Sequence, residues 1–291
     1  MRFAVIECED SEKWADGFAA FIQPALQERP TDEWVVFKTA LDGSLPGPDD
    51  AFDGIVLTGS HYNTRDERPW QAPLVAYLRS VFVPRDAAPT ARLAGGHRPP
   101  RVVGICYGHQ LIAAAFGGRV DYNPGGVFVL KAERVTPTAA LAAQPFAADL
   151  VCVSPEDGAV RVVDVTDDAV GLATPSDGVL AAAKHAGWSD TLRLLESHGD
   201  CVAELGPEAT LLASSPSCAH EMVLTGANML SLQGHPEFDY ESCIAARIWP
   251  AVVGARQRLS AAEQADALAS FAAPRHSRLV LECMRRFLRG V

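Results

Sequence analysis

The sequence predicts an α/β protein with an open, mostly parallel sheet, helices on both faces of that sheet and a small antiparallel hairpin extension. Two observations predict the parallel part. Apolar runs too short for helices recur in the first part of the chain, at residues 3–6, 34–37, 54–57 and 101–105. Amphipathic stretches lie between them, at 14–25 and 73–81. Strands that alternate with helices in this order form parallel sheets with both faces covered.

The antiparallel extension is predicted from a third observation, made after residue 193. The run 209–215 (ATLLASS) is followed by the run 221–238, which contains turn residues at Gly226–Asn228. Apolar runs divided by a short Gly and Asn turn are typical of hairpins. The last stretch, 276–291, has apolar residues at roughly helical intervals and ends in basic residues, which predicts a C-terminal helix.

We expect a single domain over residues 1–291, because this length suffices for one large α/β domain. Two segments interrupt the alternation of strands and helices. Residues 84–100 (PRDAAPTARLAGGHRPP) are rich in Pro, Ala, Gly and Arg, which predicts a surface insertion. Residues 136–190 mix Ala-rich and Asp-rich segments with weak strands such as 159–165, and we interpret them as a second insertion.

Composition narrows the classes of partner. The chain has 25 basic and 36 acidic residues, a net charge of −11, and no Lys/Arg block that would follow a phosphate backbone, so we expect neither nucleic acid nor a membrane surface as partner. The N-terminus lacks the pattern of a secretory signal, and no run of ~18 apolar residues occurs, which predicts a cytoplasmic protein. Seven scattered cysteines without CxxC spacing predict reduced thiols and no metal site.

Residues 104–108, Gly-Ile-Cys-Tyr-Gly, are the first candidate for chemistry. They follow a β-type run at 101–103 and precede a helix-type run at 109–116, which predicts a tight turn with Cys106 at its centre. The flanking glycines permit strained torsions and close contact between strand and helix. At a helix N-terminus the dipole and the free N–H groups favour a thiolate and can stabilise an oxyanion. By spacing alone, Cys106 is either a nucleophile or an ordinary buried thiol.

A thiolate nucleophile needs a base, and His235 is the best candidate among the eight histidines. The run 230–238, LSLQGHPEF, is a strand-like segment that ends in a Gly-His-Pro-Glu turn. Pro236 fixes the turn, and Glu237 can reach back to orient the ring of His235. The alternative is a surface turn that happens to contain these residues. The position after a strand favours a site, because ligands bind beyond the carboxyl ends of parallel strands.

The third candidate is the run 52–60, FDGIVLTGS, a buried strand that ends in Gly59 and Ser60. A glycine at this point lets the backbone approach a substrate. Its N–H could then join the N–H of Tyr107 in an oxyanion hole. The alternative is a plain glycine between a strand and a loop.

The order and spacing of these three segments resemble the class I glutamine amidotransferase family. The resemblance implies a flavodoxin-like α/β fold with a Cys-His-Glu triad. Within the family, the chain is most similar to the stand-alone members typified by the plant γ-glutamyl peptidases. The matching runs are CYGHQ at 106–110, SHGDCV at 197–202, ELGPEATLLASS at 204–215 and QGHPEF at 233–238. The likeness covers residues 1–83, 101–131 and 193–250 and leaves out both predicted insertions.

The resemblance also implies roles for single residues. Cys106 would be the nucleophile, His235 the general base and acid, and Glu237 the residue that orients His235. The N–H groups of Gly59 and Tyr107 would form the oxyanion hole.

Three further residues would lie on the substrate side of the site. Gln110 would contact the glutamyl head, and Ser60 would bind the substrate beside it. His198 belongs to a loop on the substrate side, and a structural role for its ring stays open.

The implied activity is hydrolysis of a γ-glutamyl amide bond, on a small-molecule substrate, through a thioester on Cys106 and without a metal or organic cofactor. One alternative is a glutaminase subunit that delivers ammonia to a separate synthase, since the active-site residues would be the same and residues 251–291 are too few to form a synthase domain. A second alternative is a non-catalytic binding module on the same fold. A cysteine-dependent α/β-hydrolase is disfavoured, because its acid would precede the histidine.

Overall fold

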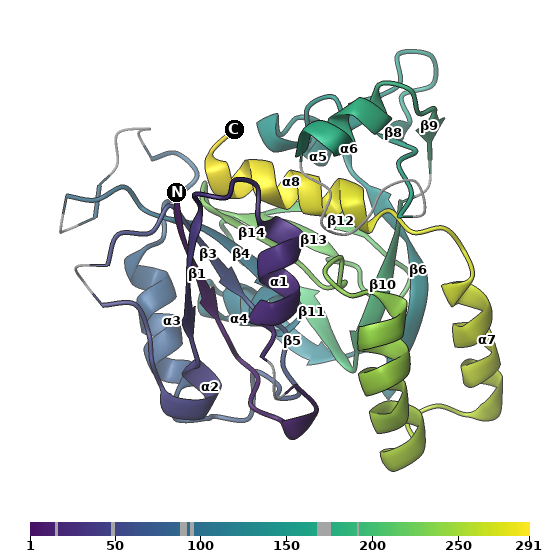
Figure 1. The fold of residues 1–291 in the computed structure, drawn as a ribbon, viewed down its shortest axis with the longest axis horizontal. Helices are drawn as coiled ribbons and strands as arrows, with labels where there is room; N and C mark the ends of the chain where they lie inside the picture. The colour runs from purple at the N-terminus through teal and green to yellow at the C-terminus, as the bar shows by residue number, and fades with distance from the viewer. Residues whose placement is uncertain (15–16, 48–49, 88–91, 94–95, 168–175, 191) are drawn as a thin grey trace.

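The computed structural model describes the chain except for residues 15–16, 48–49, 88–91, 94–95, 168–175 and 191 (Figure 1). Its centre is a sheet of nine strands. The parallel half contains β1 (Arg2–Ile6), β2 (Glu33–Phe37), β3 (Gly54–Leu57), β4 (Arg101–Ile105) and β14 (Met229–Leu232). The antiparallel half contains β6 (Val129–Pro137), β10 (Leu192–His198), β12 (Ala209–Ser214) and β13 (Met222–Thr225).

The strand order is β10-β6-β12-β13-β14-β4-β3-β1-β2. The last five of these strands are mutually parallel, and their order, β2-β1-β3-β4-β14, is the 2-1-3-4-5 order of flavodoxin-like sheets. The predicted hairpin is present as β13 and β14, which pair antiparallel around the turn at 226–228. The structure therefore confirms the predicted fold class, including its antiparallel extension.

Helices cover both faces of the sheet. On one face lie α1 (Ala19–Leu26) and α8 (Ser277–Arg289), and on the other lie α3 (Gln71–Ser80) and α4 (Tyr107–Ala115). Figure 1 shows α8 crossing the sheet beside α1. Successive strand residues point to opposite cores: Val56 packs with the residues of α8, whereas Ile55 and Leu57 pack with those of α3 and α4.

The remaining helices are short or lie at the periphery. They are α2 (Thr39–Asp42), α5 (Ala139–Ala142), α6 (Ser176–Ala183) and α7 (Ala261–Phe271), with single 3₁₀ turns at Glu12–Trp14, Pro124–Gly126 and Pro145–Ala147. Two π-helical segments, η4 (Tyr240–Ile248) and η5 (Pro250–Ala255), follow β14. None of the helices in the described ranges is long and apolar enough to cross a membrane.

Sequence periodicity locates the strands better than the first helix. The four predicted strands of the first part of the chain agree with β1 to β4 within one residue. The predicted helix at 14–25 is wrong at its start, because α1 begins at Ala19. Gly17 has a φ of +77°, and the Glu7 carboxylate accepts a hydrogen bond of 2.9 Å from the Ala19 N–H, so a distant acid defines the helix start.

The predicted insertions differ in content. Residues 136–190 include a three-stranded antiparallel sheet of β7 (Val151–Val153), β8 (Val160–Val163) and β9 (Trp188–Ser189), which with α5 and α6 lies beside α8 in Figure 1. The described residues of 84–100 contain neither helix nor strand and connect α3 to β4. That both segments are insertions in a single domain stays a prediction. A further pair of strands, β5 (Arg119–Tyr122) and β11 (Asp200–Glu204), lies near the end of α4.

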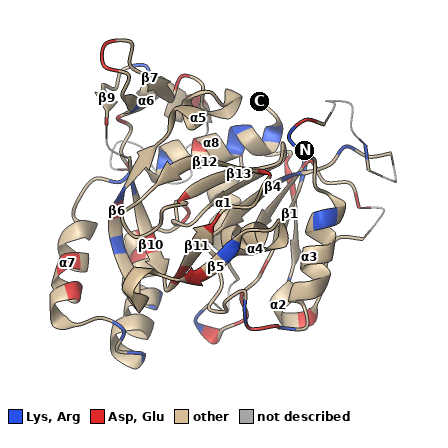
Figure 2. Ribbon diagram, turned by 180° about the vertical axis from the view of Figure 1, so that it is seen from behind, with Lys and Arg blue, Asp and Glu red and all other residues tan. Residues whose placement is uncertain are grey.

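Charged residues are dispersed over the fold. Figure 2 shows Lys and Arg scattered among Asp and Glu, and the elements drawn there carry no continuous basic stripe.

The junction between β4 and α4 leaves no room for side chains at its two glycines. A Cβ atom on Gly104 would lie 2.7 Å from the backbone carbonyl of Gly108. A Cβ atom on Gly108 would lie 2.8 Å from the backbone oxygen of Leu57 in β3. Strand, turn and helix are therefore in backbone contact, as the spacing of the glycines predicts.

We expect Gly104→Ala to lower the free energy of unfolding by about 2 kcal/mol, because the new methyl group meets backbone that cannot move aside. Urea denaturation followed by circular dichroism measures this loss. Gly187→Ala is the matched control, since Gly187 is exposed with open space around its Cα and should change stability by less than about 0.5 kcal/mol. Equal losses in the two variants would contradict the close packing.

Candidate active site

Cys106 lies between β4 and α4 with a backbone φ of 51° and ψ of −101°, an unfavourable conformation for a residue with a side chain. The contacts of Gly104 and Gly108 hold the turn in this shape. The thiol is 6% exposed and lines a cavity beyond the carboxyl ends of the parallel strands. The backbone therefore presents one sulfur atom to a cavity at a point where strand and helix meet.

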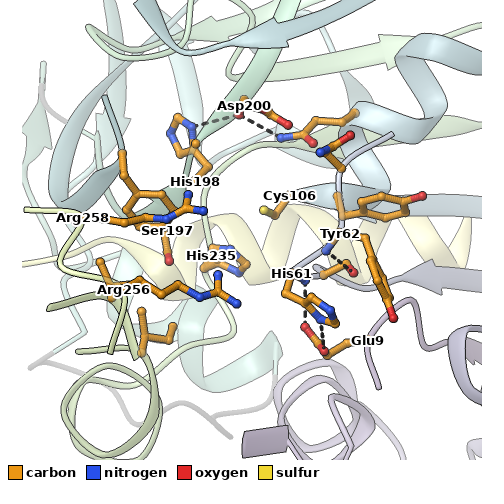
Figure 3. Close-up of a pocket in the computed structure, with 18 of the residues that line it drawn as sticks. Glu9, His61, Tyr62, Cys106, Ser197, His198, Asp200, His235, Arg256 and Arg258 are labelled. Carbon is orange, nitrogen blue, oxygen red and sulfur yellow. Dashed lines mark hydrogen bonds and ion pairs between the residues drawn. The ribbon is translucent and has the colours of Figure 1, made fainter. Parts of the chain in front are cut away.

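His235 follows β14 and is fixed on three sides. Its backbone N–H donates to the carbonyl of Leu195 at 2.8 Å, its Nδ1 lies 2.7 Å from Oε1 of Glu237, and its ring stacks on Phe238 with centroids 4.2 Å apart and planes 3° from parallel. The acceptor at Nδ1 leaves Nε2 available to face Cys106. Figure 3 shows the two side chains facing the same space.

The pKa of His235 is shifted strongly upward. Burial by itself lowers this pKa, but the negative charges of Glu237 and of the Cys106 sulfur, together with the hydrogen bonds to both, raise it to about 10. The imidazolium form is therefore present at neutral pH. A protonated ring beside the sulfur can stabilise negative charge there and can later donate its proton.

Gly59 and Tyr107, the two candidate oxyanion-hole residues, lie beside Cys106. A Cβ atom on Gly59 would lie 3.1 Å from the His235 ring and 3.6 Å from Cβ of Cys106, so both side chains approach the backbone of Gly59. Tyr107 is the first residue of α4, where N–H groups have no helical acceptor. Its hydroxyl is held separately, by a hydrogen bond of 2.7 Å from the Gln71 side chain.

The predicted substrate-side residues also lie at this cavity. Gln110 donates to the Asp200 carbonyl at 2.9 Å and to Oε1 of Gln233 at 3.1 Å, and the Ser60 hydroxyl accepts from the Tyr62 N–H at 3.1 Å. The Gln233 amide in turn lies 3.5 Å from the sulfur of Cys106. Gln233 was not among the predicted site residues, although its place directly before Gly-His-Pro-Glu is a signal that could have found it.

The ring of His198 is buried with both nitrogens directed at protein atoms. Nδ1 lies 2.9 Å from Oδ1 of Asn123, and Nε2 lies 3.5 Å from the Glu196 carboxylate. Burial lowers the pKa of His198 to about 4, so the ring is neutral. These contacts favour a role in fixing the loop that carries Asp200.

The cavity has a volume of about 660 Å³, and Figure 3 shows its lining. Six of the eight predicted site residues line it: Ser60, Cys106, Tyr107, Gln110, His198 and His235. One side carries Glu9, whose carboxylate lies 2.6 Å from Nδ1 of His61. The other side carries cationic side chains, among them Arg256 and Arg258.

One group of side chains at the cavity has the composition of a metal site. Glu9, Asp10 and His61 offer ligand atoms within 4.8 Å of one another. The oxygens of Glu9 are already bonded to His61 and to backbone N–H groups, and those of Asp10 accept from the Tyr62 hydroxyl. Their hydrogen bonds account for the arrangement without an ion.

A pair of buried acids lies behind the catalytic loop. A Cβ atom on Gly234 would lie 2.6 Å from Oε1 of Glu196 and 3.2 Å from Oε1 of Glu221, so the two carboxyl groups meet beneath this glycine. Within the described ranges neither carboxyl pairs with a Lys or Arg. Burial, together with the charges of neighbouring carboxylates, raises the pKa of Glu196 well above its usual range, and burial raises that of Glu221 to about 7.

Comparison with protein families supplies the decisive observation. The family model described as glutamine amidotransferase class-I matches residues 53–242, which include β3, the elbow at Cys106 and the turn at His235. The chain belongs to the class I glutamine amidotransferase family. The resemblance drawn from the sequence is thereby confirmed at the level of the family.

Curated relatives of this amidotransferase chain have different names. Gamma-glutamyl peptidase 3 of Arabidopsis thaliana is 26% identical over 212 residues, which are 72% of this chain and 65% of the relative. The GMP synthase (glutamine-hydrolyzing) of Burkholderia vietnamiensis is 28% identical over 184 residues, 63% of this chain and 24% of the relative. The matches thus span about two thirds of the peptidase and about a quarter of the synthase.

Solved structures agree in fold. A glutamine amidotransferase from Thermotoga maritima superposes with a TM-score of 0.58 at 16% identity, covering 99% of this chain and 98% of the other. One from Methylobacillus flagellatus gives 0.56 at 18% identity, with coverage of 99% and 92%.

We expect Cys106→Gly to be more stable to unfolding than Cys106→Ala by about 1 kcal/mol. Both variants remove the sulfur, but only glycine adopts a φ of 51° without strain. Parallel urea titrations measure the difference. The same pair of substitutions at Cys152, where φ is negative, is the control and should favour Ala. An Ala variant as stable as the Gly variant at position 106 would show that the turn is unstrained.

We expect the pair of Glu196 and Glu221 to make stability fall as pH rises. Because the folded-state pKa of Glu221 is raised from 4.5 to about 7, its contribution is complete below about pH 4.5 and is lost as the pH rises through 7. Glu221→Gln should therefore gain stability relative to the unmodified protein between pH 5 and 8, by on the order of 2 kcal/mol. Chemical denaturation at both pH values measures this gain.

Glu156→Gln is the control for that experiment, since Glu156 is exposed and should show no such gain. A Glu221→Gln variant whose stability changes with pH in parallel with the unmodified protein would contradict the raised pKa of Glu221.

Proposed function

We propose that this protein hydrolyses γ-glutamyl amide bonds of small molecules through a γ-glutamyl thioester on Cys106. The observation that carries the proposal is the convergence of the strained Cys106 turn with a His235 ring that Glu237 and Phe238 hold in place. Membership of the family supports a glutaminase-type reaction. The resemblance to γ-glutamyl peptidases supports the finer choice of substrate.

We assign the proton transfers of the reaction from the positions of Cys106 and His235. The sulfur of Cys106, paired with protonated His235, attacks the amide carbonyl, and the oxygen becomes negative facing the N–H groups of Gly59 and Tyr107. His235 gives its proton to the leaving nitrogen as the C–N bond breaks, so the amine departs and the thioester remains. Neutral His235 then takes a proton from water, whose oxygen attacks the thioester, and glutamate leaves.

The glutamyl head would lie on the side of Gln110, Ser60 and Asp200. The Gln110 amide is held by Asp200 and Gln233 at one end of the cavity, which gives the wall a fixed pattern of donors and acceptors. His198 would act on this wall through the loop it orders. Each of these groups is held by a hydrogen bond or an ion pair to the protein, which would help to position the substrate.

A second candidate is a glutaminase that passes ammonia to a separate synthase. The relative named GMP synthase (glutamine-hydrolyzing), 28% identical over 184 residues, favours it. In that case glutamine would be the substrate, and turnover would rise when the synthase partner is added. A comparison of glutamine with γ-glutamyl peptides as substrates separates the two candidates.

We expect Cys106→Ala to abolish release of glutamate from a panel of γ-glutamyl peptides and glutamine, with a loss of at least 10³-fold in kcat, because no other group forms the thioester. Coupled glutamate detection measures turnover. Cys243→Ala, which removes a buried thiol outside the cavity, is the matched control and should retain activity. Undiminished turnover by Cys106→Ala would overturn the proposal. Lack of turnover by the unmodified protein on every compound would favour a binding module.

A further inference from the structure

We propose that Lys13 and Arg256 form a site for a carboxylate on the leaving amine, so that the preferred substrates are γ-glutamyl amino acids or peptides with a free carboxylate. This inference rests on the proposed function and specifies its substrate class. It assigns the discrimination between leaving amines to two cations, which lie more than two hundred residues apart in the chain and line one cavity.

A stack of rings places Lys13 on the leaving-amine side. The ring of His235, which donates the proton to the departing nitrogen, stacks on Phe238. Phe238 stacks in turn on Trp14, with centroids 5.4 Å apart and planes 17° from parallel. The ammonium group of Lys13 lies 5.8 Å from the centre of the Trp14 ring. The substituents of the departing nitrogen therefore lead from His235 along an aromatic wall that ends in a positive charge.

Arg256 approaches the same wall from the opposite segment of the chain. It directly follows the π-helical segment η5, in which Val252 lines the cavity one turn earlier. Figure 3 shows its side chain extending toward His235, whereas Arg258 extends toward Ser197. Pro250, which lacks an N–H, begins η5, and π-helical turns of this kind are frequent at functional sites.

Among the described residues, neither cation has an anionic partner of its own. In a chain with a net charge of −11, no carboxylate of the described residues lies within ion-pair distance of either Lys13 or Arg256. The carboxylate of Glu9 raises the pKa of Lys13, but it is already bound by His61 and by the Ser11 N–H.

Burial lowers the pKa of Lys13, the charge of Glu9 partly offsets this, and the positive charge of Arg256 lowers the pKa further. Two like charges held together at the wall of a cavity are stabilised when an anion binds between them.

Two further cations at or near the cavity have contacts of their own. Arg258 lies over the Phe128 ring at 5.2 Å, close to Gly199. Arg65 pairs with Asp200 at 3.1 Å. These groups surround the end of the cavity where the glutamyl head would bind, so they act on every γ-glutamyl substrate alike. Discrimination between leaving amines is left to Lys13 and Arg256.

The test compares γ-glutamylglycine with γ-glutamylglycinamide, which differ only in the charge at the leaving end. The unmodified protein should show a kcat/KM at least tenfold higher for the acid. Arg256→Gln and Lys13→Gln should each lower kcat/KM for the acid by about tenfold and change that for the amide by less than about twofold. Arg256→Glu should reverse the preference.

Two control variants separate this effect from general ones. Arg258→Gln removes the same charge from the glutamyl side and should change both substrates by the same factor. Lys184→Gln, at an exposed position outside the cavity, should change neither. Equal kcat/KM values for acid and amide in the unmodified protein would overturn the inference and leave the proposed function intact.

Calorimetric binding to Cys106→Ala keeps the two proposals distinguishable when turnover is absent. A preference for the acid over the amide that disappears with Arg256→Gln supports the carboxylate site without reference to hydrolysis. Equal binding of the two compounds overturns it. Absence of hydrolysis by the unmodified protein, with the binding preference preserved, overturns the proposed function alone.

Discussion

The backbone of Cys106 is the constraint on which the site depends. A φ of 51° in a residue with a side chain is maintained because Gly104 and Gly108 bring β4, α4 and the end of β3 into backbone contact. This contact directs the sulfur beyond the carboxyl ends of the strands. The neighbouring strands β3 and β14 end at the same edge, so Gly59 and His235 arrive beside the sulfur as a consequence of the parallel sheet.

Charged groups lie at the His235 ring, behind the loop that carries it and along the cavity in front of it. His235 is charged because Glu237 and the sulfur outweigh the effect of its burial, and Phe238 fixes the plane in which that charge lies. Behind the loop, the carboxyl groups of Glu196 and Glu221 lie together, and no Lys or Arg of the described residues pairs with them. The packing beneath Gly234 therefore depends on their protonation. The cavity in front is lined by Glu9, which is bound by His61, and by cations that have no carboxylate within ion-pair distance among the described residues, and we propose that this arrangement gives a preference among substrates.

Sequence patterns predicted the elements that depend mainly on neighbouring residues. The strands β1 to β4 and the turn at Cys106 follow from apolar runs and from glycine spacing, so sequence and structure agree there almost residue by residue. The start of α1 did not follow, since the carboxylate of Glu7, on the end of β1, determines it through a tertiary hydrogen bond. The small sheet of β7, β8 and β9 was only partly foreseen, because its strands are two to four residues long.

The sequence by itself determined the class of fold and predicted the candidate triad, because Cys106, His235 and Glu237 occur in short motifs that a few neighbouring residues define. Only the tertiary structure brought Gln233 against the sulfur and placed Lys13 and Arg256 at one wall. Lys13 and Arg256 lie in or beside irregular or π-helical segments far apart in the chain. No local sequence pattern predicts that they line the same cavity. The physical reason is that a strained turn has a local signature in glycine, whereas the lining of a cavity depends on which distant segments the packed sheet brings together.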